Sequence, residues 1–248
     1  MKIVSVPFNG GSLKKNIGCE KAPKLILEDE ESHVLDVDNY NIIKTNEILE
    51  NADGDIFIGG DHSITYSLFK GFLKNKNKKK TGLIIFDAHP DCVNNFSPPT
   101  HEDFLRVLIE ENILLPENVF LIGLRKIDKI EEEFLRTKKI KHVLMKNLEN
   151  KESYLKLIKE IKEFVLRFDS WYLSIDIDIL DPKEAPGTGC IEKEGFKLND
   201  FKKIIKEISH VKNLERIDLV EVNPDKDIDN KTVNCAKGIL EIQKLTKT

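Results

Sequence analysis

Cysteine is scarce in this 248-residue chain, and its placement excludes several kinds of site. A structural zinc site or a thiol redox motif is built from closely spaced cysteines, so neither is predicted. Cys92 adjoins an acidic cluster and is either a metal ligand or, as we expect, a small buried thiol. Unpaired cysteines are typical of reducing compartments, and we expect a cytoplasmic protein. The four cysteines lie far apart, without a Cys-x-x-Cys pair: Cys19, Cys92, Cys190 and Cys235.

Long apolar runs, an excess of one charge and glycine-rich loops are also missing. No window reaches the length of a membrane-spanning helix, and the apolar run 3–8 is too short for a signal peptide. The formal net charge of -4 argues against general nucleic-acid binding, and the basic run 74–80 is expected to be a solvated loop. No phosphate-binding glycine loop is found. We therefore expect neither a nucleic-acid nor a membrane partner.

The apolar pattern predicts one α/β domain over residues 1–248, long enough to bury a single large core. Short β-branched runs alternate with helical patterns, which predicts a three-layer α-β-α fold around a mostly parallel sheet of eight strands. The predicted strands are 3–7, 33–37, 55–59, 82–86, 118–122, 141–144, 171–177 and 214–222. The predicted helices include 24–30, 42–51, 64–74, 102–112, 128–137, 152–168, 199–209 and 232–244.

Acidic and histidine side chains follow the ends of several predicted strands. The carboxyl ends of parallel strands meet at one edge of a sheet, where ligand crevices form. Alternate residues of an extended segment point to the same side, so the side chains converge if that geometry continues past each strand end. A lone aspartate here is usually a helix cap, but a whole set at one edge indicates a site. The set is His62, Asp87, His89, Asp91, Asp176, Asp178 and Glu221.

Gathering so many carboxylates and imidazoles in one place calls for counter-charge, because desolvating each unpaired charge costs several kcal/mol. Divalent cations supply that charge, and the four aspartates with the two histidines suit two ions. Oxygen donors with imidazole and no thiolate favour Mn²⁺ first, then Fe²⁺, Co²⁺ or Ni²⁺, with Zn²⁺ also possible. Two such ions about 3.5–4 Å apart acidify a water held between them, which implies hydrolysis.

Three motifs resemble the signatures of the ureohydrolase family, which contains arginases, agmatinases and formimidoylglutamases. They are Gly-Gly-Asp-His-Ser at 59–63, Asp-Ala-His-Pro-Asp at 87–91 and Ser-Ile-Asp-Ile-Asp-Ile-Leu-Asp-Pro at 174–182. Similarity extends over nearly the whole chain and implies a central parallel sheet of eight strands with a dinuclear manganese site. The resemblance places His62, Asp87, Asp91 and Asp176 around one ion and Asp87, His89, Asp176 and Asp178 around the other.

The resemblance also implies roles in catalysis and substrate binding. Hydroxide held between the ions attacks the guanidinium carbon, and Asp91 orients it. His101 resembles the histidine that passes a proton to the leaving amine, although a surface histidine at a helix start is the alternative. Glu221 resembles the carboxylate that pairs with the planar guanidinium through two hydrogen bonds; the alternative is a charged residue that merely ends a strand. Asp128 resembles the aspartate that meets the α-amino group of arginine.

Arginine is the expected substrate, and agmatine is the closest alternative. Pro186–Gly189 is closer to the agmatinase form of the third motif, and the stretch 92–96 does not reproduce the arginase asparagine at its usual offset. The segment 190–196 lacks the usual Pro and Gly-Gly, which predicts a different pocket rim. Another guanidino or formimino compound, a one-zinc deacylase and a catalytically silent family member rank lower. The resemblance also suggests a homo-oligomer.

Overall fold

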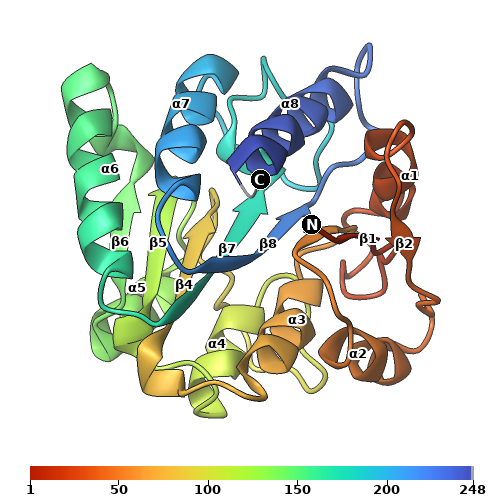
Figure 1. Cartoon of the computed structure of the whole chain (residues 1–248), viewed down its shortest axis with the longest axis horizontal. Helices are drawn as coiled ribbons and strands as arrows, with labels where there is room; N and C mark the ends of the chain where they lie inside the picture. The colour runs from red at the N-terminus through yellow and green to blue at the C-terminus, as the bar shows by residue number, and fades with distance from the viewer. Residues whose placement is uncertain (247–248) are drawn as a thin grey trace.

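Eight strands form one sheet in the order β2-β1-β3-β8-β7-β4-β5-β6, and every neighbouring pair is parallel (Figure 1). The computed structural model describes residues 1–246. The predicted parallel sheet is therefore confirmed. The strands are β1 Ile3–Ser5, β2 His33–Val34, β3 Ile56–Ile58, β4 Thr81–Phe86, β5 Val119–Leu124, β6 Lys141–Leu144, β7 Ser170–Asp176 and β8 Leu214–Val220.

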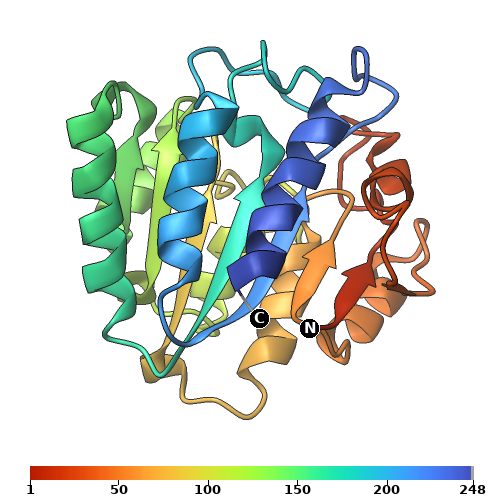
Figure 2. The ribbon, with the colours of Figure 1, turned by 45° about the horizontal axis from the view of Figure 1, so that its top comes forward.

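Helices cover both faces of the sheet, as the three-layer prediction requires. Helices α1, α6, α7 and α8 pack on one face, and α2, α3, α4 and α5 pack on the other. Figure 2 shows α6, α7 and α8 side by side in front of the sheet. The helices are α1 Ala22–Ile26, α2 Ile42–Glu50, α3 Ile64–Leu73, α4 Phe104–Glu110, α5 Lys129–Lys138, α6 Lys151–Val165, α7 Leu198–Ser209 and α8 Lys231–Thr246.

The period of two along the strands produces the two cores. In β4, Ile84 and Phe86 join the core under α6 and α7, whereas Leu83 and Ile85 join the core under α3 and α4. Both faces of the central strands are thus mainly apolar, and most buried polar side chains lie at or near the strand ends. Among the described residues, no helix combines the length and the apolarity needed to cross a bilayer.

Several predicted boundaries differ from the structure for local reasons. The prediction extended the seventh strand to Ile177, but β7 ends at Asp176 and a 3₁₀ helix covers Ile177–Ile179. The prediction extended the last strand to 222, but Glu221 has a φ of 66°, which a strand does not allow. Helix α4 begins at Phe104 rather than at 102.

The strand register brings four neighbouring strands to a common edge. Ile58 of β3 pairs with Leu219 of β8, and Phe86 of β4 pairs with Ile175 of β7. Asp176 at the end of β7 pairs with Val220 of β8. The residues that follow β3, β8, β7 and β4 therefore emerge side by side at the carboxyl edge, which is where the sequence places its acids.

Candidate metal centre and active site

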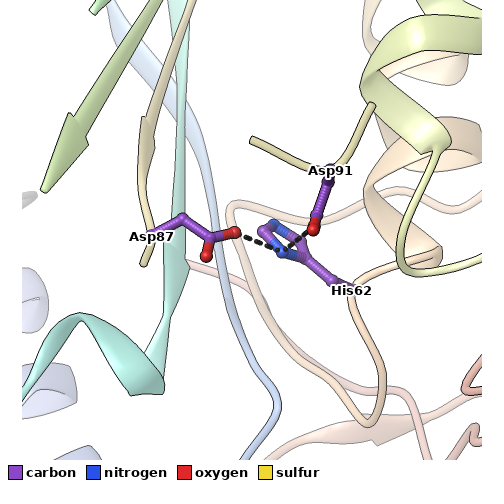
Figure 3. A group of neighbouring side chains, drawn as sticks. All are labelled: His62, Asp87 and Asp91. Atoms are coloured by element: carbon purple, nitrogen blue, oxygen red, sulfur yellow. Dashed lines mark ion pairs between the residues drawn. The ribbon is translucent and has the colours of Figure 1, made fainter. Parts of the chain in front are cut away.

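The first cluster of metal-ligand type consists of His62, Asp87 and Asp91 (Figure 3). Asp91 Oδ2 lies 3.0 Å and Asp87 Oδ2 lies 3.1 Å from the Nδ1 atom of His62. Asp176 Oδ2 lies 3.4 Å from the same nitrogen. Three carboxylates thus converge on one nitrogen of a side chain that is only 1% exposed. The four side chains predicted for one ion are together.

The second cluster consists of Asp87, His89 and Asp178. The Nδ1 atom of His89 lies 2.9 Å from Asp178 Oδ2 and 3.5 Å from Asp87 Oδ1. Asp87 therefore turns one oxygen to each cluster, which is the geometry of a bridging carboxylate. Asp176 contacts this cluster through the backbone, because its Oδ1 accepts a hydrogen bond from the Asp178 N–H at 2.8 Å. Its predicted role as a second bridge stays a prediction.

The side chains converge by a route that differs from the extended geometry expected from sequence. Asp91 has a φ of 50°, in the left-handed region, so the segment after β4 turns back at this residue. Asp178 lies in the 3₁₀ helix, and the Asp176 carboxylate caps that turn. The convergence was predicted correctly, but tight turns rather than continued strands produce it.

Burial and mutual repulsion disfavour several of these charges. Burial, followed by the charges of Asp178 and Asp87, raises the pKa of Asp176 well above its usual range. Burial and the charge of Asp87 raise the pKa of Asp91 to about 7. Burial also opposes ionisation of Asp87, yet His62 and His89 hold the pKa of this carboxyl well below its usual range. Positive charge between the clusters would relieve the same repulsion.

Two buried atoms without hydrogen bonds show that the donors fit a cation. His62 Nδ1 and Asp87 Oδ2 are both buried and make no hydrogen bond. Buried polar atoms almost always have partners, so such a pair facing one another calls for a missing group. A carboxylate oxygen and an imidazole nitrogen are both ligands for a divalent ion. The residues present therefore fit a metal.

A buried polar network holds His62 from behind. The Nε2 atom of His62 lies 2.9 Å from Ser174 Oγ, which donates to Asp218 Oδ1 at 2.5 Å. Asp218 is fully buried and also accepts hydrogen bonds from Thr65 and Tyr172. Because Ser174 donates to Asp218, it accepts from His62 Nε2–H, which leaves Nδ1 as the ring nitrogen available to a cation among the carboxylates.

Sequence reasoning missed this network, although a signal was present. Ser174 and Asp218 are polar residues that lie between apolar neighbours in buried stretches of their strands. Both belong to adjacent strands and lie opposite each other in the register. A polar residue in a fully buried strand needs a partner, so pairing such residues across neighbouring strands would have found them.

Glu221 and His101 form a buried ion pair beside the first cluster. Glu221 Oε1 accepts the backbone N–H of His62 at 2.7 Å and lies 3.2 Å from His101 Nδ1. Its Oε2 accepts a hydrogen bond from Asn16 at 2.6 Å. Burial opposes the charge of His101, but Glu221 raises the pKa of its ring to about 9. Burial likewise opposes ionisation of Glu221, while His101 holds its pKa below the usual range.

Burial excludes the surface alternative for His101, and the proposed roles of both residues stay predictions. His101 is 5% exposed and Glu221 is 4% exposed, so neither is a surface residue. Asn16 was missed, because nothing near it in sequence marks it as a partner of a residue 205 positions away. The Asn16 side-chain amide nevertheless holds the Glu221 carboxylate by donating a hydrogen bond to it.

A cavity of about 250 Å³ opens beside the two clusters. Asp128 lies at its rim, with a side chain 58% exposed and 3.8 Å from Lys126 Nζ. Its backbone N–H donates to Glu131 as part of the start of α5. Asp128 is therefore placed apart from the metal ligands, and its substrate role stays a prediction. Cys92 is fully buried and belongs to neither cluster, as expected for a structural thiol.

Comparison with known proteins agrees with this geometry. Residues 40–242 match the model of the arginase family. An arginase from Staphylococcus aureus is 31% identical over 251 aligned residues, which cover 90% of this chain and 81% of the relative.

Solved structures share the fold along almost the whole chain. The formimidoylglutamase of Bacillus subtilis has a TM-score of 0.88 at 24% identity, covering 99% of this chain and 86% of that one. An arginase of Bacillus subtilis has a TM-score of 0.84 at 25% identity, covering 98% of this chain and 97% of that one. Proteins with different names thus share this architecture, so the fold by itself does not specify a substrate.

Proposed function

The chain belongs to the arginase family of metal-dependent hydrolases, and from that premise we propose that it cleaves the guanidino C–N bond of L-arginine to release urea and L-ornithine. The observation that carries this proposal is the buried Glu221 carboxylate beside the two clusters. A full guanidinium offers parallel N–H donors to such a carboxylate. Sequence similarity to an arginase over 90% of the chain supports arginine in particular.

We further propose that the clusters hold two Mn²⁺ ions, one at His62, Asp87, Asp91 and Asp176 and the other at Asp87, His89, Asp176 and Asp178. The oxygen-rich donor set without thiolate favours this metal. When bound, the pair of ions would lower the pKa of a shared water towards neutrality and so supply the nucleophile. Everything else in the reaction falls to the side chains of the protein.

Asp91 and Glu221 arrange the two reactants. Asp91 lies at the His62 cluster and lines the cavity, so its carboxylate can accept a hydrogen bond from the nucleophile and aim it. Glu221 already accepts hydrogen bonds from His62 N–H, His101 and Asn16. A carboxylate has about four acceptor positions, so a guanidinium N–H can take the remaining one while Glu221 keeps its contact with His101.

His101 then serves as the general acid. Attack on the guanidino carbon forms a tetrahedral intermediate, and the C–N bond breaks as the leaving nitrogen takes a proton. Below pH 9 the His101 ring is mainly protonated, because Glu221 raises its pKa to about 9. Its Nε2 atom is buried and makes no hydrogen bond, so this nitrogen is available to donate the proton.

Agmatine is the second candidate, and one observation favours it. Val93 lines the cavity within the stretch where arginases carry an asparagine, and its side chain offers no hydrogen bond to an α-carboxylate. Agmatine lacks that carboxylate. The rim nevertheless carries Lys126 beside Asp128, a pair of opposite charges that suits the zwitterionic end of arginine.

A substrate screen tests the proposal. Protein loaded with Mn²⁺ is incubated with arginine, agmatine, guanidinobutyrate or formimidoylglutamate, and urea or formamide is measured. We expect urea from arginine at the highest kcat/KM. If kcat/KM is higher with agmatine, agmatine replaces arginine as the proposed substrate. If formamide is released from formimidoylglutamate, hydrolysis of a formimino group replaces hydrolysis of a guanidino group as the proposed reaction. No product from any of the four compounds indicates a catalytically silent family member.

A further inference from the structure

The two histidines of the metal clusters differ in what holds the ring nitrogen that faces away from the cluster. For His62, Nε2 contacts Ser174 at 2.9 Å, and Ser174 is tied to the buried Asp218. For His89, Nε2 lies 3.8 Å from the Oε1 atom of Glu192. A metal-bound histidine usually donates its second N–H to a carboxylate or carbonyl, which fixes the ring and raises its basicity.

Glu192 comes from the irregular segment between the 3₁₀ helix Ile177–Ile179 and α7. This segment is held at its ends, where the Phe196 N–H donates to the carbonyl of Ile179 and Asp181 N–H donates to that of Phe196. Glu192 thus lies on a loop with a fixed base. The Glu192 side chain is 32% exposed, and that of His89 is 21% exposed. The pair therefore lies at the mouth of the cavity, which both residues line.

Arg125 connects Glu192 to the second cluster by its backbone. The guanidinium follows β5 and donates from Nη2 to the carbonyls of Asp178 and Glu192, the latter at 3.3 Å. Its Nη1 donates to the carbonyl of Ile179 at 3.3 Å. The Arg125 guanidinium thus binds the backbone both at Asp178, in the second cluster, and at Glu192, which faces His89. The backbone that carries Glu192 is therefore held in position.

We propose that Glu192 is the positioning residue of the second ion, accepting the Nε2 proton of His89 so that Nδ1 stays directed at Asp87 and Asp178. This assignment rests on the proposed dinuclear site. A separation of 3.8 Å exceeds a hydrogen bond by about 0.8 Å and suits a pair that closes slightly or is bridged by one water. Glu192 lies in the segment 190–196, which lacks the usual Pro and Gly-Gly.

A metal titration tests the assignment without relying on turnover. Metal-free full-length protein is titrated with Mn²⁺ by calorimetry, and bound Mn²⁺ is counted by electron paramagnetic resonance. The wild type is expected to bind two ions in two steps. Glu192→Ala should weaken the second step by about 10–100-fold and leave the first unchanged. Glu192→Gln keeps an acceptor oxygen without the charge, so its Mn²⁺ affinity in the second step should lie between those of the wild type and Glu192→Ala.

Glu194→Ala is the matched control, because Glu194 is an exposed acid two residues away in the same segment. It should bind Mn²⁺ as the wild type does, and thermal unfolding should show that all variants are folded. Equal second-step affinity in Glu192→Ala and the wild type overturns the assignment. So does a wild type that binds a single ion.

The substrate-contact alternative gives a different pattern. If Glu192→Ala raises KM for arginine while its Mn²⁺ affinity is unchanged, Glu192 binds substrate and does not position His89. Failure of the proposed function is separate again. Protein that shows the graded Mn²⁺ affinities but releases no urea from any guanidino compound retains the positioning role and loses the ureohydrolase activity.

Discussion

His62 and His89 both face the carboxylate of Asp87, but the protein surrounds the two rings differently. His62 is 1% exposed, lies 4.5 Å from the Phe104 ring and is tied through Ser174 to a buried carboxylate. The His89 side chain is 21% exposed and faces Glu192 on a loop. The first half of the site is supported by buried central strands and core side chains, whereas the second half depends on an irregular segment.

The fold therefore positions the ligands of the His62 half, whereas the loop contributes to the His89 half. Strand ends in a fully buried sheet are rigid, so the His62 half is preorganised for a cation. A loop at the cavity mouth varies more easily among relatives, so changes in its sequence can alter the metal affinity of the His89 half. We therefore expect the ion at His62 to bind more tightly than the ion at His89.

The largest expected effect comes from removing the side chain that both halves share. Asp87→Asn keeps the size but loses the charge and one acceptor oxygen, so both ions should be lost. Turnover should fall by about 10⁴-fold, equivalent to roughly 5.4 kcal/mol of barrier. Bound Mn²⁺, measured by plasma emission, should approach zero. Retention of one tightly held ion would show that Asp87 is not shared.

Asp181→Asn is the control for this substitution. Asp181 is an aspartate outside both clusters, where its side chain caps a turn by accepting the Lys183 N–H. Its replacement should leave both Mn²⁺ content and turnover near those of the wild type.

His101→Asn should lower turnover by on the order of 100-fold while both ions remain bound. The reason is that His101 touches Glu221 and neither metal cluster. The measurement is steady-state kinetics together with Mn²⁺ content. Equal turnover removes His101 as the general acid, and loss of metal would place it in the His62 half instead.

The pH profile sharpens this result. The pKa of His101 is raised to about 9, so the proton donor is present below that pH and is lost as pH rises through it. The wild-type kcat/KM, which reports groups of the free enzyme, should therefore fall above about pH 9, and His101→Asn should lack that descending limb. The same limb in both proteins would assign it to another group.

Glu221→Gln should raise KM for arginine by about 10–100-fold, because hydrogen bonds to a charged group are worth about 1.5–3 kcal/mol. Glu221 also accepts the His62 backbone N–H, so Mn²⁺ affinity is measured alongside KM. Gln keeps that acceptor, and affinity should change little. Unchanged KM would remove Glu221 from substrate binding.

The smallest expected effect mirrors the Glu192 experiment in the other half. Ser174→Ala removes the partner of His62 Nε2 and should weaken the first Mn²⁺ step by about tenfold. It also deprives the buried Asp218 of one donor, which should lower the free energy of unfolding by about 1–3 kcal/mol. Weakening of the second step instead would reverse the comparison between the halves.

Much of the His62 half could be predicted from sequence, because strand periodicity and acids at strand ends are local signals. The sheet, the edge, the five residues of the two clusters and the neighbouring Asp176 followed from those signals together with the family motifs. The turns that close the site could not be predicted, since the left-handed conformations of Asp91 and Glu221 have no glycine to mark them.

The side chains that contact the site residues from distant segments could not be predicted from local sequence patterns, for a different reason. Asn16 contacts Glu221 across 205 positions, and Glu192 faces His89 from a segment without regular structure. Such pairs exist only once the sheet has brought distant strand ends together. The sequence indicated a different rim at 190–196 but not the side chain that carries the difference.

Anomalous diffraction from crystals of the Mn²⁺-loaded protein tests the central claim most directly. Two peaks are predicted, one beside His62 and Asp91 and one beside His89 and Asp178, with an Asp87 oxygen on each. After partial chelation, the peak beside His89 should weaken first. A single peak, or none, with the acids of both clusters turned away from each other would contradict the account.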